Sequence, residues 1–129
     1  VLDVVESPDK GIVFTGITQT IPANQSGTED IILIKTDSLG NEIWRNTYGT
    51  LSTKDRGTSL AVAHDGGYII GGVRGIVGTF DPIDEYRPML IKTDSLGVIE
   101  WQKVYGPIDT LNQPANGVIS TQDGGYVFV

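Results

Sequence analysis

The hydrophobic residues of this chain fall in short runs separated by turn residues, and no long stretch keeps the 3.6-residue spacing of a helix. The runs are rich in β-branched and aromatic residues, and 17 glycines and 6 prolines punctuate the chain. This pattern predicts an all-β protein. The predicted strands are residues 2–6, 12–17, 31–36, 42–48, 59–63, 68–73, 89–93, 99–105, 117–121 and 126–129.

The chain also repeats itself. Residues 33–49 (LIKTDSLGNEIWRNTYG) and residues 90–106 (LIKTDSLGVIEWQKVYG) are identical at 11 of 17 positions, at a spacing of 57 residues. A second phrase, DGGY followed by an apolar run, begins at Asp65 and again at Asp123, and a divergent copy begins at Asp9. A fixed period in this range is typical of repeat architectures. With four predicted strands per period, it favours β-propeller blades of four antiparallel strands in an incomplete ring.

The phase of the repeat divides the chain into three parts. Residues 1–16 are a partial repeat with strands one and two, residues 17–72 hold strands three and four and then one and two of the next unit, and residues 73–129 are a truncated blade repeat. A single blade cannot bury both faces of its sheet. We therefore expect neighbouring blades, either from a longer protein of which this sequence is an excerpt or from other chains.

The repeated residues have evident structural roles. Strand alternation places Trp44 with Tyr48 on one strand face, and Trp101 with Tyr105 on another. We expect these aromatic side chains to pack against a neighbouring sheet. The Asp-Ser-Leu-Gly segments that begin at Asp37 and Asp94 are predicted to be type I turns, in which the Asp accepts backbone N–H bonds and the Gly is left-handed.

Two variable segments, residues 18–29 and 74–87, are predicted to be loops between the second and third strand of each unit. Variable connections on a rigid repeat scaffold are where binding specificity usually lies. A second set of loops, residues 50–58 and 107–116, is expected to join consecutive units. The candidate ligand-contact residues are Asn24, Arg74, Asp81, Asp84, Glu85 and Tyr86.

Composition narrows the possible functions. The formal net charge is −7 with scattered Lys and Arg, which argues against nucleic-acid binding. The chain has no cysteine, which excludes a disulfide frame and a thiolate zinc site. No apolar run approaches the length of a membrane span. No cofactor and no metal are expected.

Catalytic chemistry finds little support. His64 is the single histidine, precedes a tight turn, and is replaced by Gln122 in the next copy, so a catalytic triad lacks its other members. The acids Asp81, Asp84 and Glu85 lie close together in the sequence. Paired acids can serve glycoside hydrolysis or, as a lesser option, bind calcium weakly, but such a charge run favours a solvated acidic loop. We therefore expect the chain to be non-catalytic.

The phrases KTDSLG followed by Trp, and DGGYIIGG, resemble a repeat of secreted and cell-surface proteins of Bacteroidota that are described as β-propeller repeat proteins. The paired Gly71-Gly72 with a later Trp is also similar to the kelch pattern. The first resemblance covers essentially the whole chain and implies an extracellular or cell-surface location. It also implies O-glycosylation at Asp-Ser/Thr-apolar triplets, which gives Ser38, Ser95 and Thr110 as acceptors. Stabilisation of the turns alone would explain the serines as well.

We therefore expect a non-catalytic structural or binding segment of a larger exported or cell-surface protein, with loops that contact carbohydrate, matrix or protein partners. Two alternatives stay open. One is a propeller enzyme whose active site lies outside this sequence. The other is a surface-structure subunit that polymerises through open blade edges.

Overall fold

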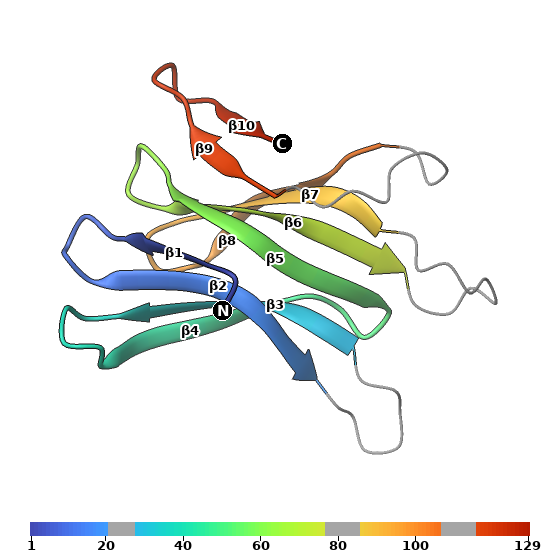
Figure 1. Ribbon diagram of the computed structural model, residues 1–129, viewed down its shortest axis with the longest axis horizontal. Coiled ribbons are helices and arrows are strands. Elements are labelled where there is room, and N and C mark those ends of the chain that lie inside the picture. The colour runs from blue at the N-terminus through green and yellow to red at the C-terminus, as the bar shows by residue number, and fades with distance from the viewer. Residues whose placement is uncertain (21–27, 77–85, 107–115) are drawn as a thin grey trace.

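The computed structural model describes residues 1–20, 28–76, 86–106 and 116–129, and all regular structure in these ranges is β-strand. Two four-stranded antiparallel sheets follow each other along the chain, and a two-stranded hairpin follows them (Figure 1). The first sheet contains β1 (Asp3–Glu6), β2 (Ile12–Thr20), β3 (Thr28–Thr36) and β4 (Glu42–Tyr48). The second sheet contains β5 (Thr53–Val62), β6 (Tyr68–Ile76), β7 (Tyr86–Thr93) and β8 (Ile99–Val104), and the hairpin contains β9 (Val118–Ser120) and β10 (Tyr126–Phe128).

The predictions of an all-β protein and of four-stranded antiparallel sheets are confirmed. Within each sheet the strands pair in chain order, each antiparallel to its neighbour. The sheets therefore span residues 3–48 and 53–104. The limits of the repeats as the sequence divides them, after residues 16 and 72, fall inside β2 and β6, since a sequence repeat can be cut at any phase.

Several strands are longer than the hydrophobic pattern predicts. The pairing of β2 with β3 continues to Thr20 and Thr28, and the pairing of β5 with β6 begins at Thr53 and Ile76. The predicted loops 18–29, 50–58 and 74–87 are therefore wrong at their ends. Ladder hydrogen bonds use only the backbone, so pairing continues through polar residues, and a register shift between Gly57 and Ser59 interrupts the alternation within β5.

The two predicted Asp-Ser-Leu-Gly turns are confirmed. Asp37 Oδ1 accepts the backbone N–H groups of Leu39 at 2.8 Å and Asn41 at 2.9 Å. Asp94 Oδ1 accepts the corresponding groups of its own turn at 2.9 and 2.8 Å. The glycines that end the turns have φ angles of +86° at Gly40 and +79° at Gly97, the left-handed region that favours glycine.

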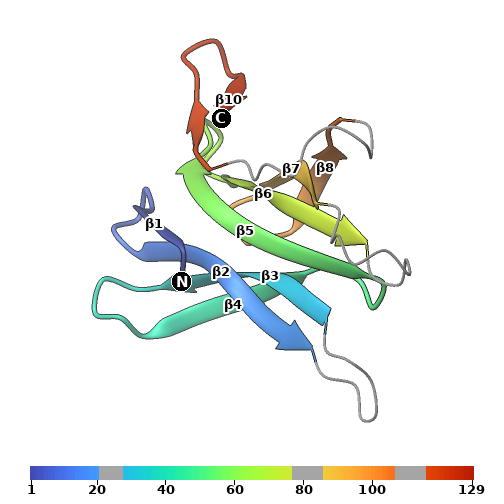
Figure 2. The same ribbon diagram turned by 45° about the vertical axis from the view of Figure 1, so that its right-hand side comes forward.

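The sheets and the hairpin pack face to face in succession (Figure 2). We call the face of a sheet that points toward the next sheet along the chain its back face, and the opposite face its front face. The front face of the second sheet therefore points toward the first sheet. The first interface, between the first sheet's back face and the second sheet's front face, buries Val13, Ile31, Leu33, Tyr48, Leu60, Tyr68, Ile70, Met89 and Ile91. The second interface, between the second sheet and the hairpin, buries Ile69, Leu90 and Val118.

The repeated aromatic residues pack across these interfaces, as predicted. The Trp44 ring of the first sheet lies 6.1 Å from the Tyr68 ring of the second sheet, between centroids. The Trp101 ring of the second sheet lies 5.9 Å from the Tyr126 ring of the hairpin. Both pairs are tilted, the geometry that aromatic quadrupoles favour. The same contact therefore forms twice, one repeat apart.

The front face of the first sheet is apolar and partly exposed. Val4 is 55% exposed and Ile12 is 41% exposed, and Phe14, Ile32 and Ile34 share their face. The corresponding front-face positions of the second sheet are Leu60, Tyr68, Ile70, Met89 and Ile91, and all of these are buried.

No helix in the described ranges is long and apolar enough to cross a membrane.

Candidate functional site

A charged cluster lies where β6 leads into the segment 77–85. Arg74 of β6 donates to Asp55 of β5 through both Nε, at 3.1 Å to Oδ1, and Nη2, at 3.0 Å to Oδ2. Asp55 is fully buried. Burial raises the pKa of the Asp55 carboxyl, and the guanidinium of Arg74 opposes that rise. Arg74 therefore serves first to hold a charge inside the protein.

A second ion pair joins the two sheets at the same end. Arg56 of β5 donates to Glu29 of β3. The Arg56 guanidinium also lies over the ring of Tyr86, 5.0 Å from its centroid, in a cation–π contact. Both pairs link strands close to the points where the variable segments 21–27 and 77–85 begin or end in the sequence.

The structure places two of the six candidate ligand-contact residues, and it does not bring them together. Arg74 pairs with Arg87 and Gly75 pairs with Tyr86, so Arg74 and Tyr86 are one ladder position apart. Adjacent ladder positions point to opposite faces of a sheet. Both residues lie in strands rather than in the loop that the sequence predicts. Residues Asn24, Asp81, Asp84 and Glu85 lie outside the described residues.

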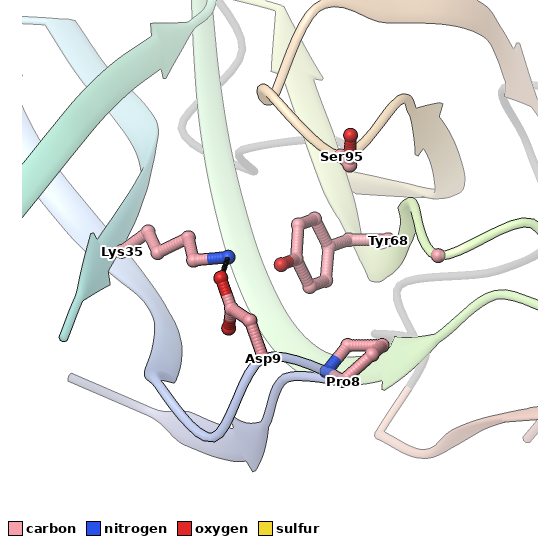
Figure 3. Close-up of a pocket in the computed structure, with 6 residues that line it drawn as sticks. Pro8, Asp9, Lys35, Tyr68 and Ser95 are labelled. Atoms are coloured by element: carbon pink, nitrogen blue, oxygen red, sulfur yellow. Dashed lines mark hydrogen bonds and ion pairs between the residues drawn. The ribbon is translucent and has the colours of Figure 1, made fainter. Parts of the chain in front are cut away.

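A different site lies between the two sheets, near their other end. A hollow of about 190 Å³ opens there (Figure 3), and its lining residues are Pro8, Asp9, Lys35, Gly66, Tyr68 and Ser95. Lys35 Nζ donates to Asp9 Oδ2 at 2.5 Å. The hydroxyl of Tyr68 points toward this ion pair. The tyrosine is fully buried, and within the described residues its hydroxyl has no hydrogen-bond partner.

The ion pair in the hollow is stable at neutral pH. Burial is the largest single influence on the pKa of Lys35 and lowers it, but the hydrogen bond to Asp9, the charge of Asp9 and the interaction with Tyr68 together leave that pKa above its ordinary value. Hydrogen bonds from Lys35, from the Ser7 hydroxyl and from the Gly11 backbone N–H hold the pKa of Asp9 far below its usual range. Lys35 therefore stays an ammonium and Asp9 a carboxylate.

The same lysine of the second repeat has a fuller set of partners. Lys92 Nζ donates to Asp65 Oδ2 at 2.7 Å, to Glu100 Oε2 at 2.7 Å and to the Thr93 carbonyl at 2.9 Å. An ammonium has three N–H donors, so those of Lys92 are all used. The sequence analysis missed both lysines. The available signal was a lysine that recurs inside an apolar strand, one repeat apart, together with a recurring turn aspartate.

The proposed glycosylation acceptors are accessible where the structure describes them. Ser38 and Ser95 are both exposed in their turns, and Ser95 also lines the hollow. Thr110 lies outside the described residues. His64 is exposed and its Nε2 contacts the carbonyl oxygen of Thr121, which links the turn of the second sheet to the hairpin.

The hollow presents an ammonium and a hydroxyl, which together suit a small polar group. Within the described ranges, no three His, Cys, Asp or Glu side chains come together in a way that could hold a metal ion. In comparisons with known proteins, no family model matches the chain and no curated protein matches its sequence.

Proposed function

We propose that the chain is a non-catalytic repeat segment of an exported or cell-surface protein, built as β-propeller blades that display variable segments to carbohydrate, matrix or protein partners. The observation that carries this proposal is how the repeated residues are used. Trp44 packs on Tyr68 and Trp101 packs on Tyr126, so the conserved part of the repeat serves sheet-to-sheet packing. What differs between repeats is left for recognition.

The packing supports a propeller because it is repetitive and directional. Each back face receives the front face of the next unit, and the same aromatic contact forms at both interfaces. Continuing this step leads to a ring, which removes the unpaired faces. The apolar front face of the first sheet, with Val4 and Ile12 exposed, is then the surface on which a neighbouring blade of the same or another chain packs.

The display function is supported by the rigid base under the variable segments. The pairs Arg74–Asp55 and Arg56–Glu29 cross-link the strand ends beside residues 21–27 and 77–85. Rigid strand ends lower the entropy that a binding segment loses when it meets its partner. Recognition then depends on those segments rather than on the repeated phrases.

Replacing the two variable segments tests this function. The chain and a variant with Gly-Ser links in place of residues 21–27 and 77–85 are compared on an array of glycans and immobilised matrix proteins. We expect the parent to bind at least one class and the variant to lose that binding at an unchanged melting temperature. Binding that survives in the variant, or turnover of an arrayed glycan, contradicts the proposal.

A second candidate function is a subunit that polymerises head to tail. The observation that favours it is the exposed apolar front face of the first sheet, because a heterologous contact that does not close makes filaments. Sedimentation across a hundredfold range of concentration distinguishes the two. Growing assemblies that Ile12→Lys abolishes support the filament, and a single closed species supports the ring.

The O-glycosylation of Ser38, Ser95 and Thr110 is a further part of the proposal. It is supported by the exposure of both serines in their turns. Intact mass of protein from the native source tests it, with Ser38→Ala and Ser95→Ala as the matched variants. A mass equal to that of the bare chain contradicts it.

A further inference from the structure

The two repeats differ in how they satisfy one buried ammonium. The side chains of Lys35 and Lys92 are 10% and 3% exposed. Lys92 has two carboxylate partners, Asp65 and Glu100. Lys35 has one, Asp9. A buried ammonium is stable only when its N–H groups are hydrogen-bonded, and Lys35 lacks the second carboxylate partner that Lys92 has.

The missing partner follows from one substitution between the repeats. Ile43 stands 57 residues before Glu100, at the same position of the repeat. Both β3–β4 and β7–β8 have the same register shift, at Lys35/Thr36 and at Lys92/Thr93, so the two side chains leave equivalent points of the backbone. Ile43 is 55% exposed and offers no acceptor.

The hollow lies beside Lys35, the lysine that lacks this second carboxylate. Its lining includes Asp9, Lys35 and Tyr68, and the counterparts of these three residues in the second interface are Asp65, Lys92 and Tyr126. Glu100 belongs to that second group. Burial raises the pKa of Tyr126, and the charges of Lys92, Asp65 and Glu100 all act on it as well. In the first interface, the Tyr68 hydroxyl is buried and has no partner among the described residues. A buried donor without an acceptor is costly, so a ligand that brings an acceptor to it is favoured.

We propose that the hollow between the sheets binds a ligand carboxylate, which takes beside Lys35 the place that Glu100 takes beside Lys92. The carboxylate accepts from Lys35 Nζ and from the Tyr68 hydroxyl, and Ser95 lines the hollow on the side of the second sheet. The charges agree with the second interface, where one ammonium is balanced by two carboxylates.

The size of the hollow limits the ligand. Its 190 Å³ is smaller than the pockets of roughly 300–1,000 Å³ that hold drug-sized molecules. It suits a free small acid or one sugar acid unit of a glycan. The lining residues named above do not belong to segments 21–27 and 77–85, so the loop replacement described above does not alter them and tests a different statement.

Amide and lysine-ammonium NMR spectra of the whole chain, titrated at constant ionic strength, test the site. The probes are glucuronate and acetate, and the controls are glucose and sodium chloride. We expect saturable shifts at Gly66, Tyr68, Ser95 and the Lys35 ammonium with a Kd on the order of 1 mM. Saturation by acetate as tight as that by glucuronate assigns the site to a small acid, and tighter glucuronate binding assigns it to a sugar acid. Either result supports the proposal.

One variant supplies the missing carboxylate within the chain. Ile43→Glu recreates the second repeat's arrangement and should weaken probe binding at least about tenfold, while the matched Ile43→Gln should leave it unchanged. Position 43 is exposed, so neither change threatens folding. The proposal is overturned if neither acid shifts these signals at 50-fold the expected Kd, if glucose shifts them equally, or if Ile43→Glu binds as the parent does.

Discussion

The first and second interfaces use the same repeated residues and bury them to different depths. The first interface joins two complete sheets and holds nine buried hydrophobic residues among those described. The second joins a complete sheet to a two-stranded hairpin and holds three. Trp44 in the first interface and Trp101 in the second are each partly buried. Tyr48 is buried in the first interface, whereas Tyr105 is only partly buried in the second.

The difference shows that the repeated sequence specifies which contacts can form. The neighbouring sheet decides how far each contact is buried and how much it contributes to stability. The Asp94–Gly97 turn of the second sheet lies under the first sheet, where Asn46 donates to the Leu96 carbonyl at 3.1 Å and Tyr48 donates to the Gly97 carbonyl at 2.7 Å. The identical turn of the first sheet, which ends at Gly40, has open space around it. The same sequence thus makes a covered turn once and an open turn once.

Leu33 and Leu90, which occupy the same repeat position in the two interfaces, give the largest expected loss of stability. Leu33 is fully buried in the larger core and Leu90 is 3% exposed in the smaller one. Leu33→Ala should lower the free energy of unfolding by about 3–4 kcal/mol, and Leu90→Ala by about 2 kcal/mol, because the hairpin can move to fill the cavity. Urea denaturation with unchanged slopes measures both. Equal losses would show that the hairpin closes its interface as firmly as a full sheet does.

Gly97→Ala and Gly40→Ala separate backbone strain from interface packing. Both residues have positive φ, so each alanine should cost about 1 kcal/mol in any surroundings. At Gly97 the added Cβ would also collide with Asn46 Nδ2 and come within 3.0 Å of the Trp44 ring, whereas at Gly40 it would meet nothing within 4 Å. We expect a total loss of about 3 kcal/mol for Gly97→Ala. A loss no larger than that of Gly40→Ala would mean that the interface yields without cost.

Much of the fold could be predicted from the sequence, because the features that decide it are local. Period-2 alternation and the Asp-Gly turns gave the strands, and the β4 strand agrees with its prediction at both ends. The early start of β5 could not be predicted, since the register shift beside Gly57 breaks the alternation on which the prediction rests. The polar ends of β2 and β6 pair through the backbone, which leaves no hydrophobic signal.

The candidate site was harder to predict, because it depends on which residues meet across two sheets. Lys35 and Asp9 are 26 positions apart, and Tyr68 comes from the next sheet. Their recurrence one repeat later was visible, but recurrence alone does not distinguish a buried ion pair from an exposed one. The substitution of Glu100 by Ile43 gains meaning only once Lys35 and Lys92 are known to be buried.

Asp9→Asn and Asp65→Asn test the difference between one and two carboxylate partners. Asp9→Asn leaves the Lys35 ammonium buried without a carboxylate, whereas Lys92 keeps Glu100 after Asp65→Asn. We expect the melting temperature to fall by about 5 °C in the first variant and about 2 °C in the second. Calorimetry at pH 7 makes the comparison, and equal shifts would contradict it.

The pH dependence gives a control for the Asp9 variant. The pKa of Asp9 is lowered in the folded protein, chiefly by the hydrogen bond from Lys35, from an ordinary value of 3.8. A lowered carboxyl pKa stabilises the fold above the unfolded value and loses that contribution as the pH falls below it. The gap between the parent and Asp9→Asn should therefore narrow between about pH 4 and pH 2. A constant gap would assign the loss to packing rather than to charge.

Tyr48→Phe and Tyr105→Phe give the smallest difference and isolate a single hydrogen bond. The Tyr48 hydroxyl donates to the Gly97 carbonyl across the first interface, whereas the Tyr105 ring packs 4.9 Å from the Phe128 ring and its hydroxyl has no described acceptor. Tyr48→Phe should cost about 1 kcal/mol and Tyr105→Phe close to nothing. Burial also raises the pKa of Tyr48 above its ordinary value of 10.0, so its contribution is present below pH 10 and is lost as the pH rises beyond it. Urea titrations at pH 7 and pH 11 should therefore show a gap between the parent and Tyr48→Phe that shrinks at the higher pH. A gap that stays the same would mean that Tyr48 has the same pKa in the folded and the unfolded chain, which would contradict the role given to its buried hydroxyl.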